Sequence, residues 1–169
     1  MSNLFEESLE VRADLYAAAR RIRRDCKLGS GKDGTVFQTS AATAIKVFRH
    51  TETFNREREC YARLAEMSVR SVLGHAVPQM MDSDEALLVI EMTIVEPPFI
   101  LDFASAYVDY PPEFSDDVME DWRQQKHFQF GDNWGHVQIL LDVLENTYGI
   151  YFLDPSPGNI KFDETTSEP

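Results

Sequence analysis

The sequence predicts an α+β fold in which an antiparallel five-stranded sheet with one helix precedes a mostly helical second part. β-rich runs separated by short polar turns lie within residues 26–48 and 77–92, and an apolar stripe with helical spacing runs through residues 132–148. The turn between the first two β-rich runs is rich in glycine. With 169 residues, 43% of them hydrophobic, the chain suits one domain or a two-lobed unit.

The first predicted element is an amphipathic helix over residues 4–24, within an N-terminal segment 1–26. Its apolar residues recur mostly every three, four or seven positions: Leu4, Val11, Leu15, Ala18, Ala19 and Ile22. Arginines cluster near its end, where cations suit the helix dipole. Two interpretations remain open: the helix packs on the β-rich lobe, or it binds a partner or an acidic surface.

Five strands and one helix are expected to form a small lobe over residues 27–96. The strands lie near 26–30, 34–39, 43–48, 77–81 and 86–92, and the helix lies near 53–66. Glu96-Pro97-Pro98 then breaks the chain.

The remaining residues, 97–169, are expected to form a partial and mostly helical second lobe. A short helix is expected at 100–108, and the acidic stretch from Tyr110 to Asp121 is interpreted as an exposed insertion. A helix over 132–148 then ends at Gly149, and a short apolar strand follows at 150–153.

The run Leu28–Val36 contains three glycines at G-x-G-x-x-G spacing. Glycine lets a backbone come close to phosphate oxygens without a side-chain clash. The dinucleotide-binding version of this pattern opens a helix, whereas here the β-rich residues 35–39 follow. Strand, glycine turn, strand, short turn and strand with Lys46 is the order of the protein-kinase phosphate loop.

In this order the motifs resemble those of the protein kinase-like family from about Lys27 to Asp163. Ala44-Ile45-Lys46 is similar to the V-A-I-K strand, so the resemblance implies that Lys46 pairs the α- and β-phosphates of ATP and has a catalytic role. Glu57, or the neighbouring Glu59, then resembles the helix glutamate that pairs with this lysine. By the same resemblance, the ATP-binding residues are Gly29, Ser30, Gly31, Gly34, Val36, Lys46, Glu57, Glu91 and Thr93, the last two in a run that leads into an adenine-binding hinge.

Asp154-Pro155-Ser156-Pro157-Gly158-Asn159 has the D-x-x-x-x-N spacing of the catalytic loop. The resemblance implies that Asp154 accepts the proton of the substrate hydroxyl and that Asn159 holds Mg²⁺. The family's H-R-D reads Phe152-Leu153-Asp154 here, and Ser156 stands where serine/threonine kinases usually have lysine. The Pro-Gly-Asn ending looks more like aminoglycoside and lipopolysaccharide kinases.

The sequence after Asn159 shows no D-F-G motif and no activation segment, and Asp163 resembles a turn residue. In the family, the D-F-G aspartate helps to hold the metal ions that bridge the β- and γ-phosphates. Two hypotheses follow. The first is an ATP-binding, Mg²⁺-using kinase-like domain whose catalytic competence depends on another metal ligand. The second is a non-catalytic pseudokinase-type module that regulates a protein partner.

Composition narrows the possible partners. The net charge is −13, and residues 101–169 contain 3 basic and 14 acidic side chains, which argues against general nucleic-acid binding. The acidic part either is a solvated face or attracts a basic partner. Apolar surface on the 132–148 helix is expected to need a partner, a second copy or the N-terminal helix to cover it.

The cellular location is inferred from the lack of membrane-spanning, signal-peptide and metal-binding cysteine patterns in the sequence. It has no 18-residue apolar run, so no membrane insertion is expected. Its acidic N-terminus is unlike a signal peptide, and its two cysteines, Cys26 and Cys60, lack metal-ligand spacing. We therefore expect a cytoplasmic protein.

Overall fold

The computed structural model describes residues 3–163, with side chains from residue 8 onward, and it confirms the α+β fold. Five strands form one antiparallel sheet in the order β1-β2-β3-β7-β6. Their bounds are Arg24–Ser30 for β1, Gly34–Thr39 for β2, Thr43–Phe48 for β3, Met80–Asp84 for β6 and Val89–Thr93 for β7. The predicted five-stranded sheet is therefore present.

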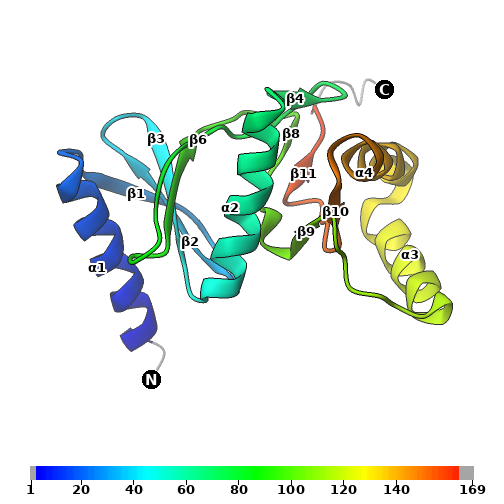
Figure 1. The fold of residues 1–169 in the computed structure, drawn as a ribbon, viewed down its shortest axis with the longest axis horizontal. Helices are drawn as coiled ribbons and strands as arrows, with labels where there is room; N and C mark the ends of the chain where they lie inside the picture. Colours follow the sequence, from blue (N-terminus) through cyan, green and yellow to red (C-terminus); the bar gives the residue numbers. More distant parts are fainter. Residues whose placement is uncertain (1–2, 164–169) are drawn as a thin grey trace, which may run out of the picture.

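Two helices cover the two faces of this sheet (Figure 1). Helix α1 (Asn3–Ala19) packs on one face, and helix α2 (Thr51–Glu66) lies on the other, between the sheet and the second part of the chain. Since side chains alternate along β3, Ile45 and Val47 face α1 whereas Ala44 and Lys46 face the α2 side.

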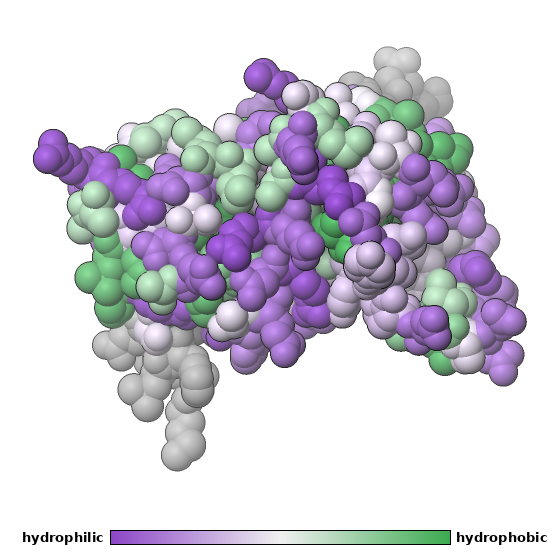
Figure 2. All heavy atoms as spheres, in the orientation of Figure 1, coloured by the Kyte–Doolittle hydropathy of each residue, from purple (hydrophilic) through white to green (hydrophobic). Residues whose placement is uncertain are grey.

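The predicted helix over 4–24 ends at Ala19, and Arg24 begins β1, so its end was wrong, as was its predicted apolar stripe. The helix buries Leu9, Ala13 and Tyr16, whereas Val11 and Leu15 are 52% and 55% exposed. Both sets have helical spacing, and the larger aromatic surface of Tyr16 is the one that fills the space against the sheet. Figure 2 shows hydrophobic surface over α1 and a largely hydrophilic surface over α2.

The second part contains two α-helices, of which the sequence predicted only the second. The predicted helix is α4 (Trp134–Tyr148), which buries Trp134, Val137, Leu140 and Leu144. The stretch interpreted as an exposed insertion instead runs into helix α3 (Asp116–Phe130), which leads to α4 through the 3₁₀ turn η2 (Gly131–Asn133). The Ser115 hydroxyl caps α3, and acidic residues in its first turn favour the helix dipole.

Short strands join the two parts. One four-stranded sheet has the order β11-β8-β5-β4. Its strands are β11 (Ile160–Lys161), β8 (Phe99–Ile100), β5 (His75–Ala76) and β4 (Ser71–Val72). A two-stranded ladder pairs β9 (Ala106–Val108) with β10 (Ile150–Phe152). The predicted short helix at 100–108 was therefore wrong, because this segment holds the end of β8, the 3₁₀ turn η1 (Phe103–Ser105) and β9.

Three aromatic side chains in contact extend the hydrophobic core from α2 into the second part. Phe103 lies 5.5 Å from Tyr61 and 5.3 Å from Phe152, measured between ring centroids. All three side chains are buried, so the small lobe and the segments after it share one core. Among the helices of residues 3–163, none is long and apolar enough to cross a membrane.

Candidate functional site

A cavity of about 530 Å³ lies between the five-stranded sheet and the segments that contain Asp102 and Asp154. Nearly every residue that the sequence nominated lines it: Gly29, Ser30, Gly31, Gly34, Val36, Lys46, Glu57, Thr93, Asp154 and Asn159. Glu91 is the exception. The structure therefore brings together residues that are widely separated in the chain.

The three glycines in and beside the turn between β1 and β2 are explained by different physical causes. A Cβ on Gly34 would overlap the carbonyl oxygen of Val47 in β3, so close strand packing requires glycine there. A Cβ on Gly29 or Gly31 would meet nothing within 4 Å. Packing does not require these two glycines, and their effect is to leave the cavity free of side chains.

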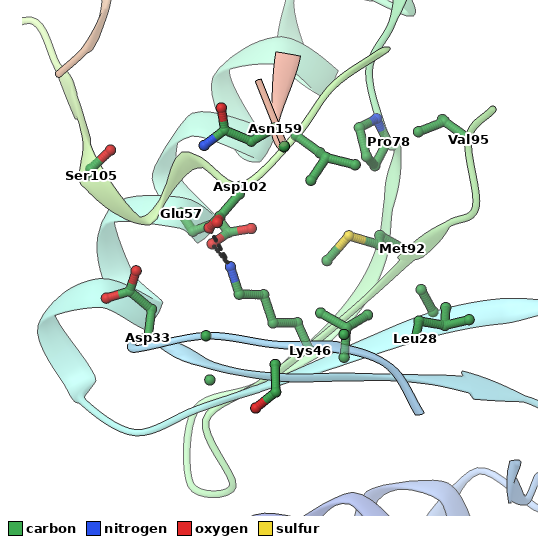
Figure 3. Close-up of a pocket in the computed structure, with 18 of the residues that line it drawn as sticks. Leu28, Asp33, Lys46, Glu57, Pro78, Met92, Val95, Asp102, Ser105 and Asn159 are labelled. Atoms are coloured by element: carbon green, nitrogen blue, oxygen red, sulfur yellow. Dashed lines mark hydrogen bonds and ion pairs between the residues drawn. The ribbon is translucent and has the colours of Figure 1, made fainter. Parts of the chain in front are cut away.

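Lys46 points from β3 into the cavity and contacts two carboxylates (Figure 3). Its Nζ lies 2.6 Å from Glu57 Oε2 and 2.7 Å from Asp102 Oδ1. Glu57 is buried on α2, whereas the alternative, Glu59, is exposed. Glu57 is therefore the glutamate that pairs with Lys46.

The charges in this cluster shift each other's ionisation. Burial lowers the pKa of Lys46, but the charges of Glu57 and Asp102 outweigh burial and hold that pKa above its ordinary value. Burial raises the pKa of Glu57, and the positive charge of Lys46 opposes that rise. Lys46 thus remains a fixed cation at neutral pH.

Asp102 is a site residue that sequence reasoning missed. It begins the turn η1 with φ 69° and ψ 64°, in the left-handed region that aspartate adopts more readily than most residues. The signal that could have found it is the Asp102-Phe103 pair that directly follows the short apolar run 99–101. Its function depends on distant contacts that a local pattern does not reveal.

Asn159 is held by its own loop. Its side-chain Oδ1 accepts a hydrogen bond from the backbone N–H of Ser156 at 2.6 Å, and its Nδ2 donates to the carbonyl of Asp154 at 3.3 Å. An amide oxygen has two lone pairs, so Oδ1 keeps acceptor capacity towards the cavity. The loop is therefore an ordered structure that joins Asp154 to Asn159.

Helix α3 holds the Asp154 carboxylate through a second missed residue, Lys126. Its Nζ donates to Asp154 Oδ1 at 2.8 Å and to the carbonyl of Pro155 at 2.8 Å. The indole of Trp122 on the same helix donates to the carbonyl of Leu153 at 2.8 Å. Lys32 of the glycine turn lies 3.8 Å from the other oxygen of Asp154, in an exposed pair.

Glu91 lies on the opposite face of the sheet. Its carboxylate accepts hydrogen bonds from the Tyr16 hydroxyl at 2.9 Å and from the Thr43 hydroxyl at 2.7 Å. The structure thus places its side chain in the contact between α1 and the sheet and not in the cavity. The wall nearest to it is lined instead by the next four residues: Met92, Thr93, Ile94 and Val95.

No group of three or more His, Cys, Asp or Glu side chains that could hold a metal ion alone occurs within the part of the chain that the structure describes. Asp102 and Asn159 both line the cavity and present oxygen atoms of the kind that Mg²⁺ prefers. They fit a Mg²⁺ ion that takes its other ligands from phosphate and water, which is the usual way proteins hold this ion.

The fold and the site define a class. An antiparallel five-stranded sheet, a glycine turn between β1 and β2, Lys46 on β3 and its partner Glu57 on α2 form a protein kinase-like small lobe. The expected resemblance is therefore confirmed at the level of the fold.

No protein-family profile and no curated protein matches the chain. Among solved structures, it is similar to the streptomycin–ATP–APH(2")-IIa ternary complex, with 21% identity, a TM-score of 0.39 and coverage of 57% of this chain and 30% of that chain. It is also similar to the gentamicin–APH(2")-IIa complex, with 19% identity, a TM-score of 0.37 and coverage of 50% of this chain and 28% of that chain. The chain thus matches less than a third of the length of either one, and the fold assignment rests on its own topology.

Proposed function

We propose that the chain binds ATP in this cavity and forms the site of an ATP-dependent phosphotransferase. The observation that carries the proposal is the buried Lys46–Glu57 pair under a turn whose two open glycines leave the cavity clear. Taking two charges out of water is costly, and such a pair contributes little to stability by itself. A fixed cation at the end of a cavity is instead suited to a phosphate group.

In this proposal, different residues of the cavity lining contact the phosphates and the base of the nucleotide. Lys46 supplies positive charge for the phosphates, and Glu57 keeps its ammonium group aimed. Val36, Ala44 and Met92 offer apolar surface for a base, and the backbone of residues 93–95 offers hydrogen-bonding groups beside it.

Transfer of the phosphoryl group also requires a proton acceptor for the substrate hydroxyl. Asp154 has this role in the proposal because its carboxylate is 53% exposed at the cavity, within reach of a second substrate. Lys126 fixes its orientation. Mg²⁺ at Asn159 would neutralise charge on the phosphates when it is bound.

The test is a calorimetric titration of the Gly31→Val variant with ATP and Mg²⁺. The new side chain meets no protein atom near its Cβ but enters the phosphate space, so the variant should fold normally and bind ATP at least tenfold more weakly, a change of about 1.4 kcal/mol. Gly135→Val, at a helix position that is equally open but outside the cavity, is the matched control and should bind like wild type.

The results separate three cases. Wild-type protein that binds no ATP at millimolar concentration would contradict the proposal. ATP binding together with phosphate transfer that Asp154→Asn abolishes would support an enzyme. ATP binding without any transfer to water or to a panel of hydroxyl substrates would favour the non-catalytic, partner-regulating module.

A further inference from the structure

We propose that Asp102, which precedes the Asp154–Asn159 loop in the chain, is the carboxylate that holds Mg²⁺ together with Asn159. The inference rests on the proposed function and deepens it. In the family pattern the metal aspartate follows the catalytic loop, whereas here the pairing of two distant strands brings an earlier aspartate to the loop.

The strand pairing is the first step of the argument. β8 pairs antiparallel with β11, with Ile100 opposite Ile160. One residue beyond this pair, the Leu101 N–H donates to the carbonyl of Asn159 at 2.9 Å. Asp102 is the next residue, so the backbone ladder places Asp102 and Asn159 at the same end of the strand pair and on the same cavity.

The backbone around Asp102 is held on both sides. Its left-handed conformation costs free energy for any residue with a side chain, and such strain persists only where the surroundings enforce it. On one side the β8–β11 ladder fixes Leu101, and on the other Phe103 is fully buried between Tyr61 and Phe152. The result is a carboxylate turned towards Lys46 and the cavity (Figure 3).

The local charge favours an added cation. Lys46 is the one hydrogen-bonding partner of the Asp102 carboxylate within residues 8–163, and it bonds Oδ1. The same ammonium also pairs with Glu57, so one positive charge faces two carboxylates. The side chain of Asp102 is 42% exposed, which leaves it accessible to an ion.

A buried polar atom in the cavity also lacks a partner. Tyr61 is almost fully buried and lines the cavity, and its hydroxyl makes no hydrogen bond of acceptable geometry within residues 8–163. Buried polar groups normally have partners, so this hydroxyl indicates that bound water or ligand belongs in the cavity that Asp102 also lines.

The experiment measures the metal directly. Mn²⁺, as a probe for Mg²⁺, is titrated into the protein with a non-hydrolysable ATP analogue, and free Mn²⁺ is followed by electron paramagnetic resonance. Asp102→Asn should weaken Mn²⁺ binding by about tenfold or more, as losses of metal-site contacts commonly do. Binding of the analogue without metal should persist, because the variant removes a negative charge near the phosphates.

Asp109→Asn is the matched control, because Asp109 is also a left-handed aspartate in an ion pair but does not line the cavity. It should leave Mn²⁺ affinity for the protein–analogue complex within twofold of wild type. Asparagine and glycine both accept the left-handed backbone, so Asp102→Gly is the second variant if Asp102→Asn folds poorly.

The outcomes distinguish the inference from the proposed function. If the analogue binds and both Asp102 variants keep wild-type Mn²⁺ affinity, Asp102 only anchors Lys46 and the inference is overturned. If wild-type protein binds no analogue with or without metal, the proposed function fails and the inference fails with it. Loss of Mn²⁺ affinity equal in Asp109→Asn and Asp102→Asn would also overturn the inference, because it would show that the effect does not come from the cavity.

Discussion

At the scale of single residues, Lys126 shows how a charge from one element controls a group on another. Its side chain is only 4% exposed, and a buried ammonium is costly unless acceptors surround it. Asp154 and Pro155 supply two close acceptors, and Gln129 supplies a weaker one at 3.4 Å. The burial of Lys126 thus fixes the Asp154 carboxylate relative to α3.

Lys126→Met is expected to lower both stability and turnover. Losing hydrogen bonds from a charged donor should reduce the free energy of unfolding by about 1.5–3 kcal/mol, which denaturant unfolding can measure. If the chain transfers phosphate, kcat should fall while KM for ATP stays unchanged, because Asp154 loses its orientation but Lys46 does not. The exposed Lys161 provides the control variant, Lys161→Met. Unchanged kcat in Lys126→Met would refute the positioning role.

At the scale of elements, local patterns predicted most of the sheet, α2 and α4. The alternation of side chains along β3 puts Lys46 on the face opposite Ile45 and Val47. The 132–148 stripe, which was expected to need a cover from a partner, a second copy or the N-terminal helix, is mostly buried within the chain by other segments. Every nominated site residue except Glu91 therefore reached the cavity. The error at Glu91 arose because the run 87–93 marks a strand but does not tell which of its side chains face the cavity.

Other elements were missed for physical reasons. Helix α3 has few apolar residues and follows two prolines, so its periodicity is weak, and its stability comes from a cap and from contacts with α4 and the loop. Asp102 was missed because its place depends on a strand pair whose members, β8 and β11, are far apart in the chain. Such pairings are set by tertiary packing, which a local pattern cannot reveal.

Close packing of β2 on β3 makes Gly34 sensitive to substitution. Gly34→Ala should destabilise the protein by about 1–3 kcal/mol, because its Cβ overlaps backbone atoms of Val47 that cannot move cheaply. Gly29→Ala, in the same turn, meets no atom and should change stability by less than about 1 kcal/mol. Thermal unfolding of both variants checks the difference. Equal melting temperatures would mean that the turn shifts to accommodate Gly34→Ala.

At the scale of the whole molecule, several buried groups make the folded state vulnerable to alkali. Burial raises the pKa of the Cys60 thiol above its ordinary 9.0, and it raises the pKa values of Tyr16 and Tyr61 above their ordinary 10.0. The unfolded chain releases these protons at the ordinary values while the folded protein retains them. Their contribution to stability is therefore intact at neutral pH and is lost as pH rises above 9.0 and then above 10.0.

Urea unfolding at a series of pH values tests this expectation. Because these groups stay protonated in both states, their contribution to the free energy of unfolding should change little from pH 7 to 8.5. Above that pH the free energy of unfolding should fall progressively. Tyr61→Phe removes a hydroxyl without a hydrogen bond, so it should cost little at pH 7 and should reduce the alkaline loss. Tyr110→Phe, at an 87% exposed position, should leave the profile unchanged. Identical profiles for wild type and Tyr61→Phe would contradict the assignment.

The ladder between β9 and β10 has a consequence for how this chain can diversify. Ala106 pairs with Phe152 and Val108 with Ile150, and the Asp109 N–H bonds the carbonyl of Gly149 at 2.8 Å. The chain therefore leaves the cavity after Asp102 and returns before Asp154 through a clamped neck. Residues 110–148 form the segment between the two ends of that neck, and Trp122 and Lys126 within it hold residues 153–155. Because both ends are fixed, the loop at 110–115, which is mostly exposed, can change length or sequence without displacing either aspartate, as long as these contacts are kept. A change of acceptor substrate in the proposed phosphotransferase can then arise in this loop while the groups proposed to handle phosphate stay in place.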